Sequence, residues 1–220
     1  MRSPDPRTVR AFQRRLLAWY ARHGRDLPWR RTRRPYRVLV SEIMLQQTQV
    51  DRVVPKYREF LRRYPTMRRL AAAPVDDVRR LWYPLGYNIR PMRLHAIARE
   101  TVARYRGRLP DDAERLRRLP GIGRYTAGAI LSFAHGKDAA ILDTNVRRVL
   151  SRVFHTPRQA ARLRGERALW DLAERLLPRG RGYDFNQALM DFGATWCTPR
   201  TPRCRPCPMR RLCASYPATG

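Results

Sequence analysis

The chain has 220 residues, enough for one large domain or two small ones. Its 47 lysines and arginines far outnumber its 18 aspartates and glutamates. A formal net charge of +29 would repel itself in a compact protein, so the composition predicts a polyanionic partner. No apolar run approaches the roughly 20 residues that cross a bilayer, and the N-terminal MRSPDPRTVR lacks the apolar core of a signal peptide. We therefore expect a cytoplasmic protein with no membrane partner and no disulfides among its four cysteines.

Apolar residues at helical spacing run through almost the whole chain, and alternating strand patterns are missing. The first pattern covers residues 9–21, and the breaker-rich stretch GRDLPWRRTRRPYR predicts a connection after it. The sequence therefore predicts an all-α fold, which ends in a short segment with too few apolar residues to fold by itself. The other expected helices cover residues 38–47, 53–63, 67–73, 75–82, 92–105, 111–118, 125–134, 145–154, 166–177 and 185–192.

A glycine-rich turn, Pro120-Gly121-Ile122-Gly123, separates two of the predicted helices. Glycine adopts backbone conformations that other residues resist, and it leaves room for a close phosphate. The next helix begins near Arg124, so its N–H groups and the positive end of its dipole face the same point. This combination binds backbone phosphate without reading sequence. An ordinary connection between two helices would look the same at this level.

Two acidic residues have the surroundings that glycosidic chemistry requires. Asp143 follows an apolar run and precedes a helix, so it is either an N-cap or a fixed carboxylate that stabilises an oxocarbenium-like cation. A second acid is needed to assist the leaving group. Glu42 lies in VLVSEIMLQQTQV among apolar neighbours, which would raise its pKa and keep a proton available. The alternative for Glu42 is an exposed position on an amphipathic helix.

Two stretches of the chain carry a family resemblance. LPGIGRYTAGAIL with ILDTNVRRVL resembles the helix–hairpin–helix and the Gly/Pro-rich loop with its aspartate in the DNA glycosylase superfamily that includes endonuclease III and MutY. The stretch SEIMLQQTQ, residues 41–49, is similar to a motif of the MutY adenine glycosylases. The resemblance extends from Leu27 to Cys213. It implies a six-helix domain over residues 26–136 that contains the hairpin, and an iron–sulfur cluster domain made of residues 1–25 and 137–220.

The four cysteines have the spacing C-x6-C-x2-C-x5-C within 17 residues, which is compact enough to hold a metal centre. Structural zinc is one alternative, but zinc sites usually show two short cysteine pairs and only one pair is close here. The spacing resembles the [4Fe–4S] motif of endonuclease III and MutY, which predicts such a cluster as cofactor. Arginines at positions 200, 203 and 205 would give the loop a phosphate-facing edge, unless they are only a solvated run. The predicted ligands are Cys197, Cys204, Cys207 and Cys213.

The resemblance to MutY implies a reaction and a partner. The enzyme would extrude adenine from double-stranded DNA, where it is paired with 8-oxoguanine or guanine, because the bond is unreachable inside the duplex. Glu42 would protonate the adenine and assist the addition of water. Asp143 would stabilise the cationic sugar, with Asn145 and Tyr125 positioning the site. We expect a monomer, associated with the nucleoid if the source is bacterial or archaeal.

Six further positions match residues that contact DNA in MutY. Core packing is a real alternative for the two aromatic side chains among them. The positions matched to the adenine pocket are Trp29, Arg30 and Gln187, and those matched to the wedge in the duplex or to the opposite base are Gln47, Thr48 and Tyr87.

Tyr125 occupies the position where endonuclease III carries the lysine that forms a Schiff base and allows strand cleavage. A phenol cannot form that intermediate. The chain has only two lysines, Lys56 and Lys137, and neither lies in a site motif. We therefore predict a monofunctional glycosylase that leaves an abasic site.

Several departures from the MutY pattern leave a second class of substrate as an alternative. The chain ends at Gly220, where MutY enzymes usually continue into a domain that recognises 8-oxoguanine, so discrimination of the opposite base is expected to be weak or altered. Thr144 replaces a common glycine, and Asn88 replaces a common second aromatic. Short thymine/uracil–guanine mismatch glycosylases share this length, the tyrosine at the hairpin and the segment from Asp184 to Phe192. A non-catalytic damage-binding protein would use the same hairpin and basic surface, but it would need neither Glu42 nor Asp143.

Overall fold

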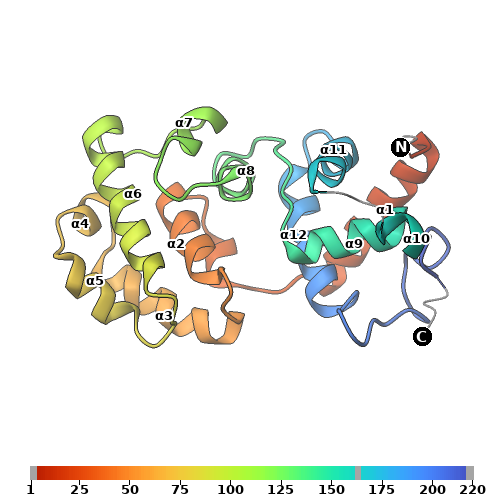
Figure 1. The fold of residues 1–220 in the computed structure, drawn as a ribbon, viewed down its shortest axis with the longest axis horizontal. Helices are drawn as coiled ribbons and strands as arrows, with labels where there is room; N and C mark the ends of the chain where they lie inside the picture. The colour runs from red at the N-terminus through yellow and green to blue at the C-terminus, as the bar shows by residue number, and fades with distance from the viewer. Residues whose placement is uncertain (1–3, 162–164, 217–220) are drawn as a thin grey trace. The chain divides into compact units, whose positions relative to one another are not determined.

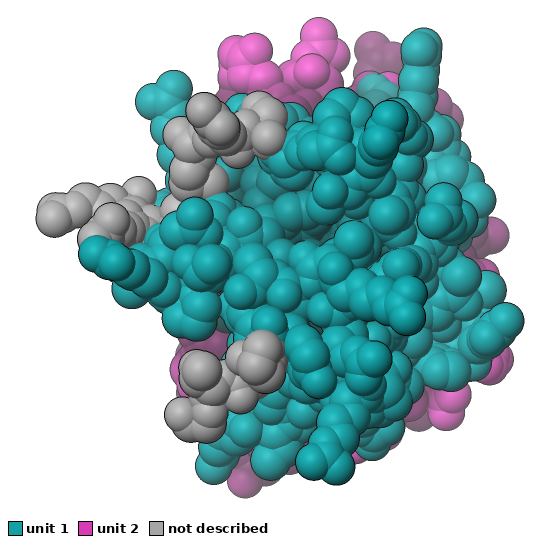
Figure 2. Space-filling model, turned by 90° about the vertical axis from the view of Figure 1, so that its right-hand side faces the viewer, with its two compact units in different colours: residues 1–25, 136–220 teal, residues 26–135 magenta. Residues whose placement is uncertain are grey.

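The computed structural model describes residues 4–161 and 165–216, and within these ranges it is built from helices, turns and loops with no strand (Figure 1). The all-α prediction is therefore confirmed for the described residues. The chain divides into two compact units, unit 1 with residues 1–25 and 136–220 and unit 2 with residues 26–135 (Figure 2). No helix in the described ranges is long and apolar enough to cross a membrane.

Unit 2 is organised around α2 (Pro35–Leu45). Seven consecutive residues of this helix, from Val38 to Met44, are buried, because α2 contacts η1, α3, α6 and α8. A helix that is buried on all sides tolerates a polar residue only where a partner meets it. The remaining elements of unit 2 are η1 (Pro28–Arg31), α3 (Val50–Arg63), α4 (Met67–Ala71), α5 (Val75–Trp82), α6 (Ile89–Tyr105), α7 (Ala113–Arg117) and α8 (Arg124–Phe133).

Unit 1 packs three long helices around an aromatic core. The ring of Phe12 meets those of Phe154 and Phe185 edge-on, with centroids 5.0 and 6.1 Å away, and Trp19 meets Phe192 at 5.0 Å. α12 contacts both α1 and α9, so it holds the N-terminal helix against the middle of the chain. The helices of unit 1 are α1 (Pro6–His23), α9 (Thr144–Phe154), α10 (Pro157–Ala161), α11 (Arg167–Leu176) and α12 (Gly182–Thr195).

The predicted helices all form, with shifted ends, and two short elements were not predicted. α1 begins three residues early because the Asp5 carboxylate accepts the Thr8 N–H at 3.2 Å and a proline fits the first turn. η1 lies in the stretch predicted to be only a connection, and it starts at Pro28. Both η1 and α10 are too short to produce a helical period, so the periodicity could not reveal them.

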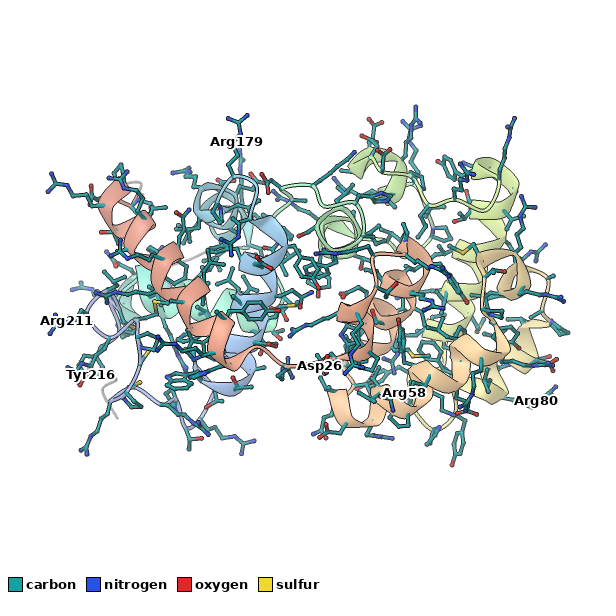
Figure 3. The ribbon with its side chains drawn as sticks, turned by 180° about the vertical axis from the view of Figure 1, so that it is seen from behind. Asp26, Arg58, Arg80, Arg179, Arg211 and Tyr216 are labelled. Carbon is teal, nitrogen blue, oxygen red and sulfur yellow. The ribbon has the colours of Figure 1, made fainter. Side chains whose placement is uncertain are left out.

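Arginine side chains project from both units. Figure 3 labels exposed arginines of unit 1, Arg179 and Arg211, and of unit 2, Arg58 and Arg80. The excess of positive charge is thus spread over the surface of both units and does not lie in one segment.

Candidate active site

Glu42 lies in the core of unit 2, where its side chain is placed by the buried helix α2. The residue is only 5 % exposed, so the alternative of an exposed glutamate is wrong. Its Oε2 accepts a hydrogen bond from the hydroxyl of Tyr125 at 2.8 Å. α2 and α8 pack together, which brings the two side chains into contact across 83 positions of sequence. A buried carboxyl group with a hydroxyl donor is the arrangement expected of a positioned acid.

The glycine turn enters α8 directly after Gly123. Gly121 has φ +78°, which favours glycine, and a Cβ there would lie 3.1 Å from Cδ of Arg93. A Cβ at Gly123 would meet nothing within 4 Å, so the backbone there has open space in front of it. Ile122 is buried and anchors the turn in the core, while Arg124 is exposed. The N-terminus of α8 has no side-chain cap, as a site that receives an external anion would require.

Asp143 is the N-cap of α9 in unit 1. Its Oδ1 accepts the Val146 N–H at 2.6 Å, and its Oδ2 accepts Nδ2 of Asn145 at 3.1 Å. Burial raises the pKa of Asp143 above its usual range, and the hydrogen bonds from Val146 and Asn145 only partly oppose this effect. Asp143 therefore has the geometry of the N-cap alternative. The half-buried position also desolvates its carboxylate, which capping does not require.

Asn145 is itself held in place by Arg148 and by the backbone of α12. Arg148 donates to Oδ1 of Asn145 at 2.8 Å and to the Gly193 carbonyl at 2.6 Å. α12 approaches so closely that a Cβ at Gly193 would lie 2.7 Å from Cβ of Asn145. The same arginine donates through Nε to the carbonyl of Cys197 at 2.8 Å. Arg148 thus joins the first turn of α9 to the start of the cysteine segment.

The residues predicted for the pocket differ in burial. Trp29 is 7 % exposed and packs edge-on against Tyr57, with ring centroids 5.5 Å apart, so it is part of the core of unit 2. Arg30 is half-buried. Gln187 is buried in α12 of unit 1, and its Oε1 has no hydrogen-bond partner among the described residues.

The residues predicted for the wedge lie in two loops of unit 2. Gln47 is exposed and Thr48 is half-buried, both in the loop after α2. Tyr87 is 58 % exposed in the loop between α5 and α6, so the core-packing alternative is wrong for this residue. Both Gln47 and Tyr87 have left-handed backbones, with φ of 55° and 50°. Such conformations in residues other than glycine are concentrated at functional sites.

The four cysteines come together at one cavity in unit 1. None of the four cysteines is paired in a disulfide, and all four line a hollow of about 270 Å³ beside Phe192 and Trp196. Burial raises the pKa of the Cys207 thiol to about 11, with smaller contributions from the three other cysteines. In the described ranges, no three His, Cys, Asp or Glu side chains are arranged to hold a single metal ion. The arginines at 200, 203 and 205 are exposed.

Arg148 and Arg90 are two polar residues of these sites that the sequence did not reveal. Arg90 is buried beside the two wedge loops of unit 2. Because the chain is so rich in arginine, the local sequence does not distinguish these two residues from the many exposed arginines. The only clue is the distance of each from a motif residue, since Arg90 is three positions after Tyr87 and Arg148 is five after Asp143.

Comparison with known proteins places this arrangement in a family. A sequence profile described as HhH-GPD superfamily base excision DNA repair protein matches residues 40–175. The chain belongs to this superfamily.

Two curated relatives and one solved structure refine the similarity. The chain is 44 % identical to the adenine DNA glycosylase of Rattus norvegicus, over 98 % of this chain and 44 % of the rat protein. It is 39 % identical to the thymine/uracil-DNA glycosylase of Pyrobaculum aerophilum, over 93 % of this chain and 91 % of that protein. A solved thermostable thymine-DNA glycosylase superposes with a TM-score of 0.90 at 36 % identity, covering 97 % of this chain and 98 % of that one. The chain thus spans less than half the length of the mammalian relatives it matches.

Proposed function

We propose that the protein is a DNA glycosylase that hydrolyses the N-glycosidic bond of adenine paired with 8-oxoguanine or guanine. The observation that carries the proposal is the buried Glu42, in the stretch SEIMLQQTQ, which accepts a hydrogen bond from the half-buried Tyr125. Identity of 44–45 % to mammalian adenine DNA glycosylases over nearly the whole chain supports adenine as the substrate.

The two carboxyl groups would have different tasks. Glu42 would donate a proton to the departing adenine, since a neutral base leaves more readily than an anion. Asp143 would remain ionised and stabilise positive charge on the sugar as the bond breaks. Asn145, held by Arg148, would fix the direction of the Asp143 carboxylate. Water adds to the cationic sugar, its proton passes to a carboxylate, and the strand keeps an abasic site.

The hydroxyl of Tyr125 would orient Glu42 and would not attack the sugar. Covalent amine catalysis requires a lysine near the reacting carbon. Lys56 instead pairs with Glu59 at 2.7 Å in α3, and Lys137 is exposed outside the predicted motifs. We therefore propose that the enzyme lacks strand-cleaving lyase activity.

The cysteine segment fits a [4Fe–4S] cluster. Four thiols around one cavity of about 270 Å³ leave room for a group larger than a single ion, and ligation by four cysteines suits such a cluster. A bound cluster would hold the segment from Cys197 to Cys213 in place, as metal ligation does for loops without a core. Arg152 would add support, because it donates to the Thr198 carbonyl at 2.7 Å and to Sγ of Cys197 at 3.6 Å.

The DNA partner would be bound mainly through its backbone. The turn at Gly121 and Gly123, the uncapped start of α8 and the overall charge of +29 all favour phosphate contacts. Gln47, Thr48 and Tyr87 would enter the duplex, and Arg30 and Gln187 would face the extruded base. We propose a cytoplasmic monomer acting on double-stranded DNA.

A panel of duplexes tests this function. Each duplex carries adenine opposite 8-oxoguanine, adenine opposite guanine, thymine opposite guanine or uracil opposite guanine, and alkali-labile sites are scored for the wild type and Glu42→Gln. We expect cleavage after alkali in the two adenine duplexes only. Glu42→Gln should lower the rate of base excision by about 10² to 10⁴-fold. Cleavage of the thymine and uracil duplexes alone would assign the chain to the other substrate class. Tight binding with no alkali-labile site would identify a damage sensor.

A further inference from the structure

Arg90 is a buried arginine at the start of α6 that bonds to two loops at once. The residue is 3 % exposed. Its Nη1 donates to the carbonyls of Ile43 at 3.4 Å and Met44 at 2.9 Å, and also to that of Gln46. Its Nη2 donates to the carbonyls of Leu85 and Gly86, each at 3.0 Å. One guanidinium therefore joins the end of α2 to the loop between α5 and α6.

The bonds of Arg90 reach the backbone directly before each wedge residue. It binds the carbonyl of Gln46, which precedes Gln47, and the carbonyl of Gly86, which precedes Tyr87. Among the described residues only three other than glycine have positive φ, and Gln47 and Tyr87 are two of them. Strained backbone of this kind persists only where the surroundings fix it. Arg90 supplies that fixation on both sides.

The guanidinium of Arg90 lies over two aromatic rings. Its Cζ lies 5.2 Å from the ring centroid of Tyr87 and 5.5 Å from that of Trp82. Trp82 in turn donates from Nε1 to the Gly86 carbonyl at 3.3 Å. The exposed ring of Tyr87 thus rests on a buried cation, which restrains its direction through a cation–π contact.

We propose that Arg90 is a positioning residue that holds Gln47 and Tyr87 as a preformed pair of probes for the DNA duplex. The proposal rests on the function given above, in which these residues enter the duplex during base extrusion. A wedge that is already ordered does not lose conformational freedom when it inserts. Only arginine offers five donors in a planar fork, so lysine could not bond to both loops in this way.

The test compares Arg90→Met and Arg90→Lys with Arg99→Met. Arg99 is an exposed arginine of the same helix, so its replacement removes the same charge without touching the loops. Hydrogen exchange is followed by mass spectrometry in residues 46–49, 84–88 and, for comparison, 125–133. Base extrusion is followed by the fluorescence of 2-aminopurine in place of the target adenine, and excision of adenine by single-turnover kinetics at saturating enzyme.

We expect faster exchange confined to residues 46–49 and 84–88 in both Arg90 variants. The single-turnover rate should fall by about 10 to 10²-fold, in the range caused by a misplacement of about 1 Å. DNA affinity should change by less than about threefold, because phosphate contacts supply most of it. Arg90→Lys keeps the buried charge, so it decides the question if Arg90→Met does not fold.

Two results would overturn the proposal. One is exchange in residues 46–49 and 84–88 that matches the wild type. The other is exchange raised equally throughout residues 26–135 with an unchanged excision rate per folded molecule, which would make Arg90 a general stabiliser. A wild type that excises no base would refute the proposed function instead, while the exchange pattern would still show whether Arg90 holds the two loops.

Discussion

Replacing Asp143 separates its role as a helix cap from its role in catalysis. The carboxylate accepts the Val146 N–H at 2.6 Å and Nδ2 of Asn145 at 3.1 Å. Asparagine retains an oxygen that can accept the Val146 N–H, and it is as good an N-cap as aspartate. Alanine retains neither bond. Asp143→Asn therefore removes the charge and keeps the cap, whereas Asp143→Ala removes both.

The two variants should differ in stability. Loss of the cap in Asp143→Ala should lower the free energy of unfolding by about 0.5–2 kcal/mol. For a chain of this size that corresponds to a fall in Tm of roughly 1–8 °C. Asp143→Asn should keep the wild-type Tm or exceed it at neutral pH, because burial disfavours the ionised carboxylate that it removes.

The pH dependence follows from the direction of the pKa shift. Burial raises the pKa of Asp143 in the folded state, so the folded protein binds this proton more tightly than the unfolded chain. The stability that the group contributes is present below its unfolded pKa and is lost as the pH rises through its folded pKa. The Tm of Asp143→Asn minus that of the wild type should therefore grow from acidic to neutral pH. A difference that shrinks over this range would contradict the electrostatic reasoning.

Activity gives the decisive comparison. If Asp143 stabilises the cationic sugar, Asp143→Asn should lose on the order of 10² to 10³-fold in the single-turnover rate despite its intact cap. The assay uses saturating enzyme and an adenine:8-oxoguanine duplex, with thermal unfolding measured on the same preparations. An Asp143→Asn enzyme with wild-type activity would show that Asp143 is only a cap.

Three further predictions concern other parts of the molecule. Gly193→Ala should destabilise the fold by about 1–3 kcal/mol, because the new Cβ would lie 2.7 Å from Cβ of Asn145. This cost exceeds the gain in helix propensity from alanine. The control variant Ala194→Ser, at an exposed neighbouring position, should unfold like the wild type. Arg124→Gln should weaken binding to all duplexes alike and reduce the slope of log K against log salt by about one, and an unchanged slope would remove Arg124 from the backbone contacts. The purified protein should contain iron with visible absorbance, and Cys204→Ser should lose it; a colourless wild type free of iron would contradict the cluster.

The sequence predicted the longer helices well because a long segment with one buried face shows a clear helical spacing of apolar residues. It did not predict η1 or α10, because elements of four and five residues are too short to show a helical period. The burial of Glu42 followed from its apolar neighbours, since a helix packed on all sides leaves no exposed face. Whether Trp29 packs in the core or lines a pocket depends on its contact with Tyr57, which the sequence does not encode locally.

The polar network around the site was the least predictable part. Arg90 and Arg148 hold the wedge loops and Asn145, but a chain with 47 basic residues gives no local reason to single them out. Their roles depend on backbone carbonyls that come together only in the folded protein. The sequence predicted Asp143 to be either a cap or a catalytic group. The fold gives it the geometry of a cap, together with a pKa that desolvation raises.

The most direct test of the central claim is the identity of the base released from a duplex with adenine opposite 8-oxoguanine. The products are analysed by mass spectrometry without alkali, and the DNA strand is examined on a denaturing gel. The proposed function predicts free adenine, an intact strand that breaks only after alkali, and no covalent protein–DNA complex on borohydride treatment. Absence of free adenine, or a strand cleaved without alkali and a complex trapped by borohydride, would contradict it.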